Sequence, residues 1–285
     1  MNKPEIFLGN RHSPEKLYSD FFEKIKDIKS LNKKDKIRIS HAYKSSERAH
    51  KGQFRAGGEA YFEHPRAVAL ILMEECGVED FDLIVAALLH DILEDTSFYA
   101  DLKTQTFYDW KENAKLTISD AFRRTVAKMV LTLSKPFTAG EKETKEQQLK
   151  LYYTGLNDAI RERPKTILVK MADRLHNLRT IGAMPEEKRI RKLQETRDIY
   201  IPLFEKFLTV VTANKLQLES NIEDVKREIE VISKQIEEGG NISEHKEAIS
   251  EIKKTFNALS QKKRENEQNI SAGTYLLTEI KKIVS

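Results

Sequence analysis

Residues 86–97, AALLHDILEDTS, place one imidazole and three carboxylates directly behind an apolar run. His90 and Asp91 are adjacent, and Glu94 and Asp95 follow within about one helical turn. Like charges at this spacing repel, and burying them costs free energy unless a positive charge lies between them. A bound metal ion would supply that charge, so this segment predicts a metal site.

Two further segments carry suitable ligands. His64 opens a helical pattern in FEHPRAVAL, and Asp173 follows an apolar run in ILVKMADRLHNLRT. Alone, His64 is explained as a capping or core imidazole, and Asp173 as the partner of a neighbouring arginine. Together with His90 and Asp91 they would form a mixed nitrogen and oxygen site with positions left for water. Such a set suits Mn²⁺ or Fe²⁺, whereas catalytic Zn²⁺ more often recruits Cys or three His. A metal ion makes hydroxide available near neutral pH, which is hydrolytic chemistry.

The elements that must position these residues are helices, and we predict an all-α protein. Ser13-Pro14-Glu15 is a helix start signal, with a capping hydroxyl followed by Pro at the first helical position. Residues 96–118 have weak periodicity and are expected to form an insertion or lid. Further helices are expected at residues 33–51, from residue 65, and at 80–95, 120–134, 143–162, 164–182 and 186–209.

The composition changes after about residue 210, so we expect one domain at residues 1–209 and an arm at 210–285. Apolar residues of the arm follow a four-three heptad rhythm that breaks at EEGGNIS and then restarts. This pattern predicts a coiled-coil-like helical hairpin. It would either pack back on the domain or form an arm for oligomerisation or partner binding.

Composition narrows the function classes. The chain has 285 residues, of which 49 are basic and 45 acidic, so its net charge of +4 does not call for a nucleic acid partner. The N-terminus lacks the apolar core of a signal peptide, and no run is long enough to span a membrane. The single cysteine, Cys76, excludes an internal disulfide and is typical of a reducing cytoplasm. We expect a cytoplasmic protein, and small anionic substrates remain open.

Four ordered segments resemble the hydrolase domain of the RelA/SpoT-type alarmone enzymes, which belong to the HD superfamily of metal-dependent phosphohydrolases. They are AHKGQFRAGGEAYFEHPRAVALIL, AALLHDILEDT, LVKMADRLHNLRT and ETRDIYIPL, and the resemblance covers roughly residues 35–205. It implies an HD-domain helical bundle. It also implies that the 3′-pyrophosphate of ppGpp or pppGpp (guanosine tetra- and pentaphosphate) is hydrolysed with Mn²⁺ to GDP or GTP and pyrophosphate.

The resemblance also implies residue roles. The positions that match Mn²⁺ ligands are His64, His90, Asp91 and Asp173, and the acidic pair that positions or activates the attacking water is Glu94 and Asp95. The positions that match substrate contacts are Arg55 on the guanine base, Asn177 and Thr180 near the ribose and base, and the basic residue Lys170. A salt bridge is the structural alternative for Lys170. His50 and His176 match the segments without matching ligands.

Two departures leave the specificity open. Where the family usually has Arg-Lys-Ser-Gly, this chain has Arg55-Ala56-Gly57-Gly58, which removes one positive charge beside the base or phosphates. Residues 96–118 are longer than the family's usual connection and are expected to reshape the pocket. The heptad arm stands where bifunctional relatives continue into a synthetase domain, so we expect a stand-alone small alarmone hydrolase without synthetase activity. The alternatives are hydrolysis of (p)ppApp or of the 2′-phosphate of NADPH, and an inactive HD domain that acts as a regulatory or scaffold protein through its arm.

Overall fold

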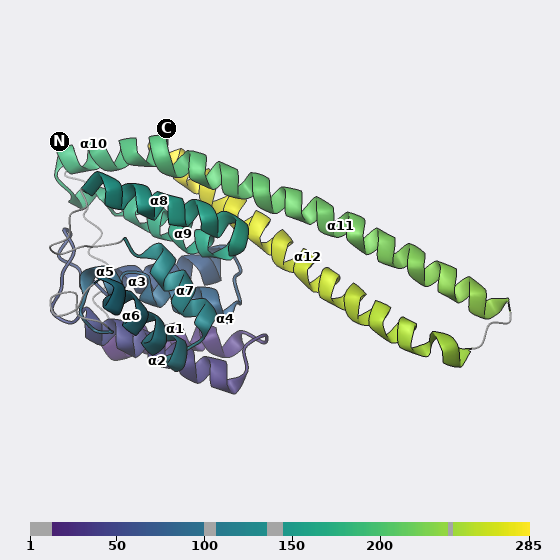
Figure 1. Cartoon of the computed structure of the whole chain (residues 1–285). Helices are drawn as coiled ribbons and strands as arrows, with labels where there is room; N and C mark the ends of the chain where they lie inside the picture. The colour runs from purple at the N-terminus through teal and green to yellow at the C-terminus, as the bar shows by residue number, and fades with distance from the viewer. Residues whose placement is uncertain (1–12, 100–106, 136–144, 239–241) are drawn as a thin grey trace.

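The computed structural model describes residues 13–99, 107–135, 145–238 and 242–285. Every regular element in this part of the chain is a helix, which confirms the predicted all-α fold. Figure 1 shows a helical body from which the long helices α11 and α12 project side by side. Among the described residues, no helix is long and apolar enough to cross a membrane.

The body is formed by short and medium helices. Their bounds are α1 (Pro14–Asp27), α2 (Lys33–Ala49), α3 (Glu63–Leu70), α4 (Phe81–Leu89), α5 (Ile92–Asp95), α6 (Phe107–Ala121), α7 (Arg124–Leu133), α8 (Lys145–Glu162), α9 (Lys165–Arg179) and α10 (Glu186–Glu195). The start predicted for α1 is confirmed, because the Ser13 side chain accepts a hydrogen bond from the Lys16 amide. A π-helical turn follows α3 at Ile71–Glu75, and a 3₁₀ turn follows α9 at Ile181–Ala183.

Helix α4 is the centre of the body. All nine of its residues are buried, and it packs against α2, α3, α7 and α9. Its N-terminus is fixed by Asp80, whose side chain accepts a hydrogen bond from the Leu83 amide at 3.0 Å. Burying a large apolar side chain contributes roughly 1.5–3 kcal/mol, so α4 is anchored along its whole length. The residue that ends this helix, His90, is therefore held in a fixed position.

The single helix predicted for residues 80–95 is wrong. Helix α4 ends at Leu89, His90 and Asp91 form a turn, and α5 begins at Ile92. Adjacent side chains on a continuous helix point about 100° apart. The turn instead brings the Nε2 atom of His90 and the Oδ1 atom of Asp91 within 3.2 Å of each other.

The insertion or lid predicted for residues 96–118 is also wrong for its second half. Helix α6 contributes Trp110, Ala114 and Ile118 to the core, at a spacing of four residues. The spacing alone is helical, but Trp110 and Ala114 stand among Lys and Glu, which masks the apolar stripe in the sequence. Residues 100–106 lie outside the described part of the chain.

The C-terminal hairpin is present, but it is joined to the body at both ends. The helix predicted for residues 186–209 is divided, because α10 gives way to a π-helical turn at Thr196–Tyr200 and then to α11 (Ile201–Glu237). Helix α11 therefore continues without a break through residues 209 and 210. Helix α12 (Ile242–Val284) returns to the body and packs along α9.

The returning end of α12 is part of the hydrophobic core. Leu276, Ile280 and Val284 are buried, and the carbonyl of Val284 accepts a hydrogen bond from Arg197 Nε at 2.8 Å. Gly273 permits a close helix crossing, because a Cβ atom there would lie 2.7 Å from Cε1 of Phe207. Of the two arrangements predicted for the hairpin, its base packs on the body while its tip projects away from it (Figure 1).

Candidate metal centre

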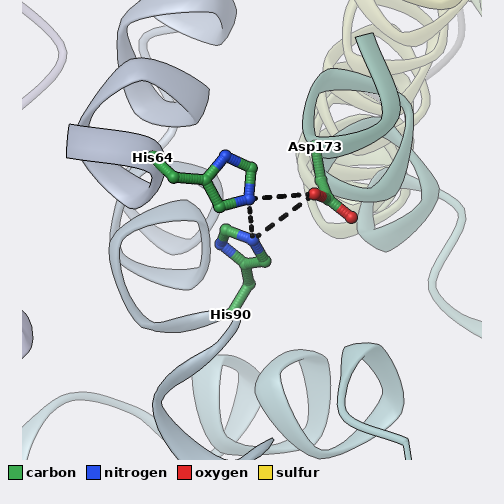
Figure 2. A group of neighbouring side chains, drawn as sticks. All are labelled: His64, His90 and Asp173. Atoms are coloured by element: carbon green, nitrogen blue, oxygen red, sulfur yellow. Dashed lines mark hydrogen bonds and ion pairs between the residues drawn. The ribbon is translucent and has the colours of Figure 1, made fainter. Parts of the chain in front are cut away.

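Three helices bring His64, His90 and Asp173 together (Figure 2). His64 lies in the first turn of α3, His90 caps the C-terminus of α4, and Asp173 lies in α9. Their ligand atoms all lie within 4.8 Å of one another, and all three side chains are buried. The Nε2 atom of His64 is 3.1 Å from Oδ1 of Asp173 and 3.3 Å from Nε2 of His90.

Asp91, the fourth predicted ligand, lies at the open side of this cluster. Its Oδ1 atom is 3.2 Å from Nε2 of His90, and its Oδ2 atom is 3.5 Å from Nε2 of His64. The side chain is 15% exposed, more than that of the other three residues. The structure thus gathers three predicted ligands in one cluster and places Asp91 beside its two histidines, and the role of all four as ligands stays a prediction.

Hydrogen bonds determine where the proton of His64 resides. Arg55 Nη1 lies 3.1 Å from Nδ1 of His176, and because a guanidinium can only donate, that nitrogen must accept. Nδ1 of His64 lies 2.8 Å from the same atom, so it must be the donor. A neutral His64 therefore carries its lone pair on Nε2, which faces His90 and Asp173.

The same reasoning applies to His90. Its Nδ1 atom donates to the carbonyl of Ala87 at 2.8 Å, which leaves the Nε2 lone pair of the neutral ring facing His64. Two imidazole lone pairs and one carboxylate oxygen then converge with no proton between them. A cation satisfies all three acceptors at once, so the donor set fits a divalent metal ion. Backbone and side-chain acceptors that orient the ligating histidines are typical of such sites.

Burial and neighbouring charges shift the titration of these groups in a consistent way. Burial acts to raise the pKa of Asp173, but the Lys170 ammonium, 2.8 Å from its Oδ2 atom, holds that pKa well below its usual range. Burial acts to lower the pKa of His90, but Asp91 and Asp173 raise it well above the usual value. A positive charge between these carboxylates is therefore favoured, whether a proton or a metal ion supplies it.

The acidic pair of α5 lies beside the cluster. Glu94 Oε1 accepts a hydrogen bond from the Lys135 amide at 2.6 Å. Burial raises the pKa of the Glu94 carboxyl, and the charges of Lys135 and Lys170 act against this shift. The Asp95 carboxylate accepts a hydrogen bond from Tyr61 Oη at 2.6 Å and lies near the surface.

The predicted substrate-contact residues occupy different surroundings. Arg55 Nη2 donates to Asn177 Oδ1 at 2.5 Å, and Asn177 in turn donates to Asp173 Oδ1 at 2.5 Å. Lys170 is buried and pairs with Asp173, which is the salt bridge named as its structural alternative. Thr180 donates to the backbone carbonyl of His176 at the end of α9. Of these four residues, only Arg55 and Asn177 are hydrogen-bonded to each other, and they lie at the edge of the cluster.

Two residues that contact the acidic pair, Tyr61 and Lys135, are absent from the sequence-based set. Tyr61 stands in the first quoted segment, three residues before His64, but loop spacing gives no sign of which way its ring points. Lys135 contacts Glu94 through its backbone amide, which any residue but Pro provides. Sequence patterns carry no signal for such a contact.

His176 predicts an acid-sensitive stability. Burial, with the nearby His64 and Arg55, lowers the pKa of His176 to about 3 from an ordinary value of 6.5. Over this range the His176 imidazole is protonated in the unfolded chain but not in the folded protein. Stability is therefore lost as the pH falls from about 6.5 to about 3. His176→Gln retains a hydrogen-bond acceptor without this titration. As the pH falls through this interval, we expect the unfolding free energy of His176→Gln to rise relative to that of the wild type.

Urea unfolding of the metal-free proteins at about pH 7, 5.5 and 4.5 measures this difference. His41→Gln is the matched control, because that histidine packs against Phe122, away from the cluster. A stability difference between His176→Gln and the wild type that stays constant over the three pH values would contradict the assignment.

Comparison with known proteins places these residues in a family context. A family model described as "HD domain" matches residues 42–207. The bifunctional (p)ppGpp synthase/hydrolase SpoT of Escherichia coli (strain K12) is 36% identical over 166 residues, which are 58% of this chain and 21% of that protein. The guanosine-3′,5′-bis(diphosphate) 3′-pyrophosphohydrolase of Haemophilus influenzae is 33% identical over 185 residues, which are 65% of this chain and 23% of that protein.

A third relative is the GTP pyrophosphokinase rsh of Brucella melitensis, 36% identical over 168 residues, which are 58% of this chain and 20% of that protein. The chain spans about a fifth of the length of these curated relatives. A solved structure described as a metazoan ortholog of SpoT that hydrolyzes ppGpp is 22% identical, with a TM-score of 0.41, over 61% of this chain and 84% of the other. The family context comes from the sequence matches.

Proposed function

This chain belongs to the HD-domain family, and from that premise we propose that it hydrolyses the 3′-pyrophosphate of ppGpp or pppGpp with Mn²⁺. The products are GDP or GTP and pyrophosphate, and we place the reaction in the cytoplasm. The observation that carries the proposal is the buried His64, His90 and Asp173 cluster beside the acidic pair of α5. The names of the relatives from Escherichia coli and Haemophilus influenzae support the substrate class.

In this proposal His64, His90, Asp91 and Asp173 hold the cation. A divalent cation bound there lowers the pKa of water and offsets the negative charge of a phosphate group. Two imidazole nitrogens with carboxylate oxygens suit Mn²⁺, and the lack of a cysteine in the cluster favours it over Zn²⁺. Lys170 orients the Asp173 carboxylate, because its ammonium donates a hydrogen bond to Oδ2 while Oδ1 faces His64.

Glu94 accepts a proton from the attacking water, and Asp95 orients that water. Burial raises the pKa of Glu94, which makes its carboxylate a better proton acceptor than an exposed glutamate. The amide of Lys135 holds one oxygen of Glu94 and leaves the other for the water. Asp95, closer to the surface, orients the same water molecule.

Arg55 and Asn177 form the base-binding side of the proposed site. Arg55 spans from His176 to Asn177, so its guanidinium plane is fixed at the edge of the metal centre, ready to stack on a purine. Thr180, one helical turn beyond His176, extends this side along the end of α9. Ala56, beside Arg55, offers no charge to a phosphate group, which leaves guanine, adenine and NADPH substrates to be distinguished by experiment.

The test is product analysis after incubation with ppGpp, ppApp or NADPH, with and without Mn²⁺, Fe²⁺ or Zn²⁺. We expect Mn²⁺-dependent release of pyrophosphate from ppGpp. We also expect no release by His90→Ala, which loses a nitrogen ligand, and unchanged release by His41→Ala. If only ppApp releases pyrophosphate, or only NADPH releases phosphate, that nucleotide is the substrate in place of ppGpp. If none of the cations supports release of pyrophosphate or phosphate from any of these nucleotides, the proposed hydrolase activity is contradicted. That result would favour a scaffold protein acting through α11 and α12.

A further inference from the structure

The hydroxyl of Tyr61 lies between the carboxylates of Asp91 and Asp95. Its oxygen is 2.6 Å from Asp95 Oδ2 and 3.1 Å from Asp91 Oδ2, and it can donate to both. Two carboxylates this close together repel each other when both are ionised. The phenol proton reduces that repulsion, and the shorter distance makes Asp95 the principal acceptor. Burial and the two carboxylates raise the pKa of Tyr61, so the phenol keeps its proton.

The ring of Tyr61 is held in place by two further residues. It stacks on the His50 imidazole, with a centroid distance of 4.7 Å and an interplanar angle of 17°. The backbone amide of Tyr61 donates to the carbonyl of Gln53 at 2.9 Å. The position of the hydroxyl is therefore fixed from the ring side as well as from the carboxylate side.

Gln53 connects this ring to the other end of Asp95. Its Nε2 atom donates to the backbone carbonyl of Asp95 at 2.8 Å, so its Oε1 atom is the acceptor for Nδ1–H of His50, also at 2.8 Å. His50, Gln53, Asp95 and Tyr61 thus form a closed ring of contacts. Asp95 is held twice, through its backbone by Gln53 and through its carboxylate by Tyr61.

We propose that Tyr61 is a positioning residue, which holds the Asp95 carboxylate apart from Asp91 and aimed at the attacking water. This proposal rests on the proposed function, because it assigns Asp95 a partner in orienting that water. In the structure the Tyr61 hydroxyl is hydrogen-bonded to the two carboxylates, and its ring packs edge-on against His64 at a centroid distance of 6.4 Å. Its hydroxyl therefore acts through Asp95, and His50 acts through Tyr61.

Tyr61→Phe tests the proposal, because it keeps the stacked ring and removes only the hydroxyl. We expect kcat to fall roughly 10- to 100-fold, the range for loss of such an orienting partner. KM and the midpoint of thermal unfolding should stay close to the wild-type values, and a Mn²⁺ titration should still show one filled site. Tyr18→Phe is the matched control, because it removes a tyrosine hydroxyl bonded to Ser40 at 2.7 Å, remote from the centre; its kcat should be unchanged.

Combining the change with Asp95→Asn tests whether Tyr61 acts through Asp95. If it does, Tyr61→Phe lowers kcat much less in the Asp95→Asn background than in the wild type. Equal factors in both backgrounds, or a wild-type kcat in Tyr61→Phe, would overturn the proposal and leave the proposed function intact. A wild-type chain inactive on every nucleotide would overturn both.

Discussion

Glu94→Gln is expected to lower kcat by roughly 10²- to 10⁴-fold, the contribution of a positioned general base, while the protein still binds Mn²⁺. The glutamine oxygen can replace Glu94 Oε1 as acceptor for the Lys135 amide, so the local structure is preserved. An amide cannot take a proton from water at neutral pH, so only the proton transfer is lost. Steady-state kinetics and a Mn²⁺ titration of the same preparation measure the two effects separately.

The pH dependence gives this prediction a second readout. Because burial raises the pKa of Glu94, the carboxylate becomes protonated, and kcat falls, at a pH above the ordinary glutamate range. This acidic limb should be absent from the residual activity of Glu94→Gln. Glu112→Gln is the control, because Glu112 pairs with Lys115 on the outside of α6. A Glu94→Gln variant with more than about a tenth of wild-type kcat, or without Mn²⁺ binding, would contradict the role of Glu94.

Lys170→Met is expected to cost the metal-free protein roughly 3–5 kcal/mol of unfolding free energy, the range for removing one partner of a buried ion pair. Lys170 is buried, and its ammonium is 2.8 Å from Asp173 Oδ2. Methionine fills a similar volume, so the loss arises from the uncompensated Asp173 carboxylate rather than from a cavity.

Mn²⁺ should restore more stability to Lys170→Met than it adds to the wild type, because a bound cation replaces the missing charge beside Asp173. Urea unfolding with and without Mn²⁺ measures both terms, and Lys150→Met, at an exposed position of α8, is the control for the substitution itself. If Lys170→Met and the wild type are equally stable without metal, Lys170 does not compensate the negative charge of Asp173.

The sequence was sufficient to predict that His64, His90, Asp91 and Asp173 meet. Three of these residues stand at the end or in the middle of strongly apolar segments, and such segments pack together in a single core. The exact arrangement was beyond sequence patterns. Periodicity shows which faces of a helix are apolar, but it does not show that the helix ends at His90. His90 and Asp91 keep right-handed helical backbone angles, so the break leaves the sequence pattern of a helix unchanged.

Contacts made by loops and helix ends were missed for a different reason. Tyr61 reaches Asp95 with its ring stacked on His50, a contact set by packing and not by spacing. The sequence left two arrangements of the hairpin open, because Leu277 and Ile280 continue the same heptad rhythm as the projecting part. The pattern looks the same whether the partner helix is α11 or α9. A truncation at residue 211 would therefore remove core residues together with the arm.

The return of α12 also constrains how this protein forms during synthesis. The ribosome completes α9, which carries Asp173, about a hundred residues before it completes the last turns of α12 that cover α9. Until residue 284 has left the exit tunnel, the apolar surface that receives Leu276, Ile280 and Val284 stays uncovered. The nascent body is therefore an incomplete folding unit, and chaperones have a surface to bind. The cluster of His64, His90 and Asp173 is fully supported only once the C-terminal end of α12 has packed on α9.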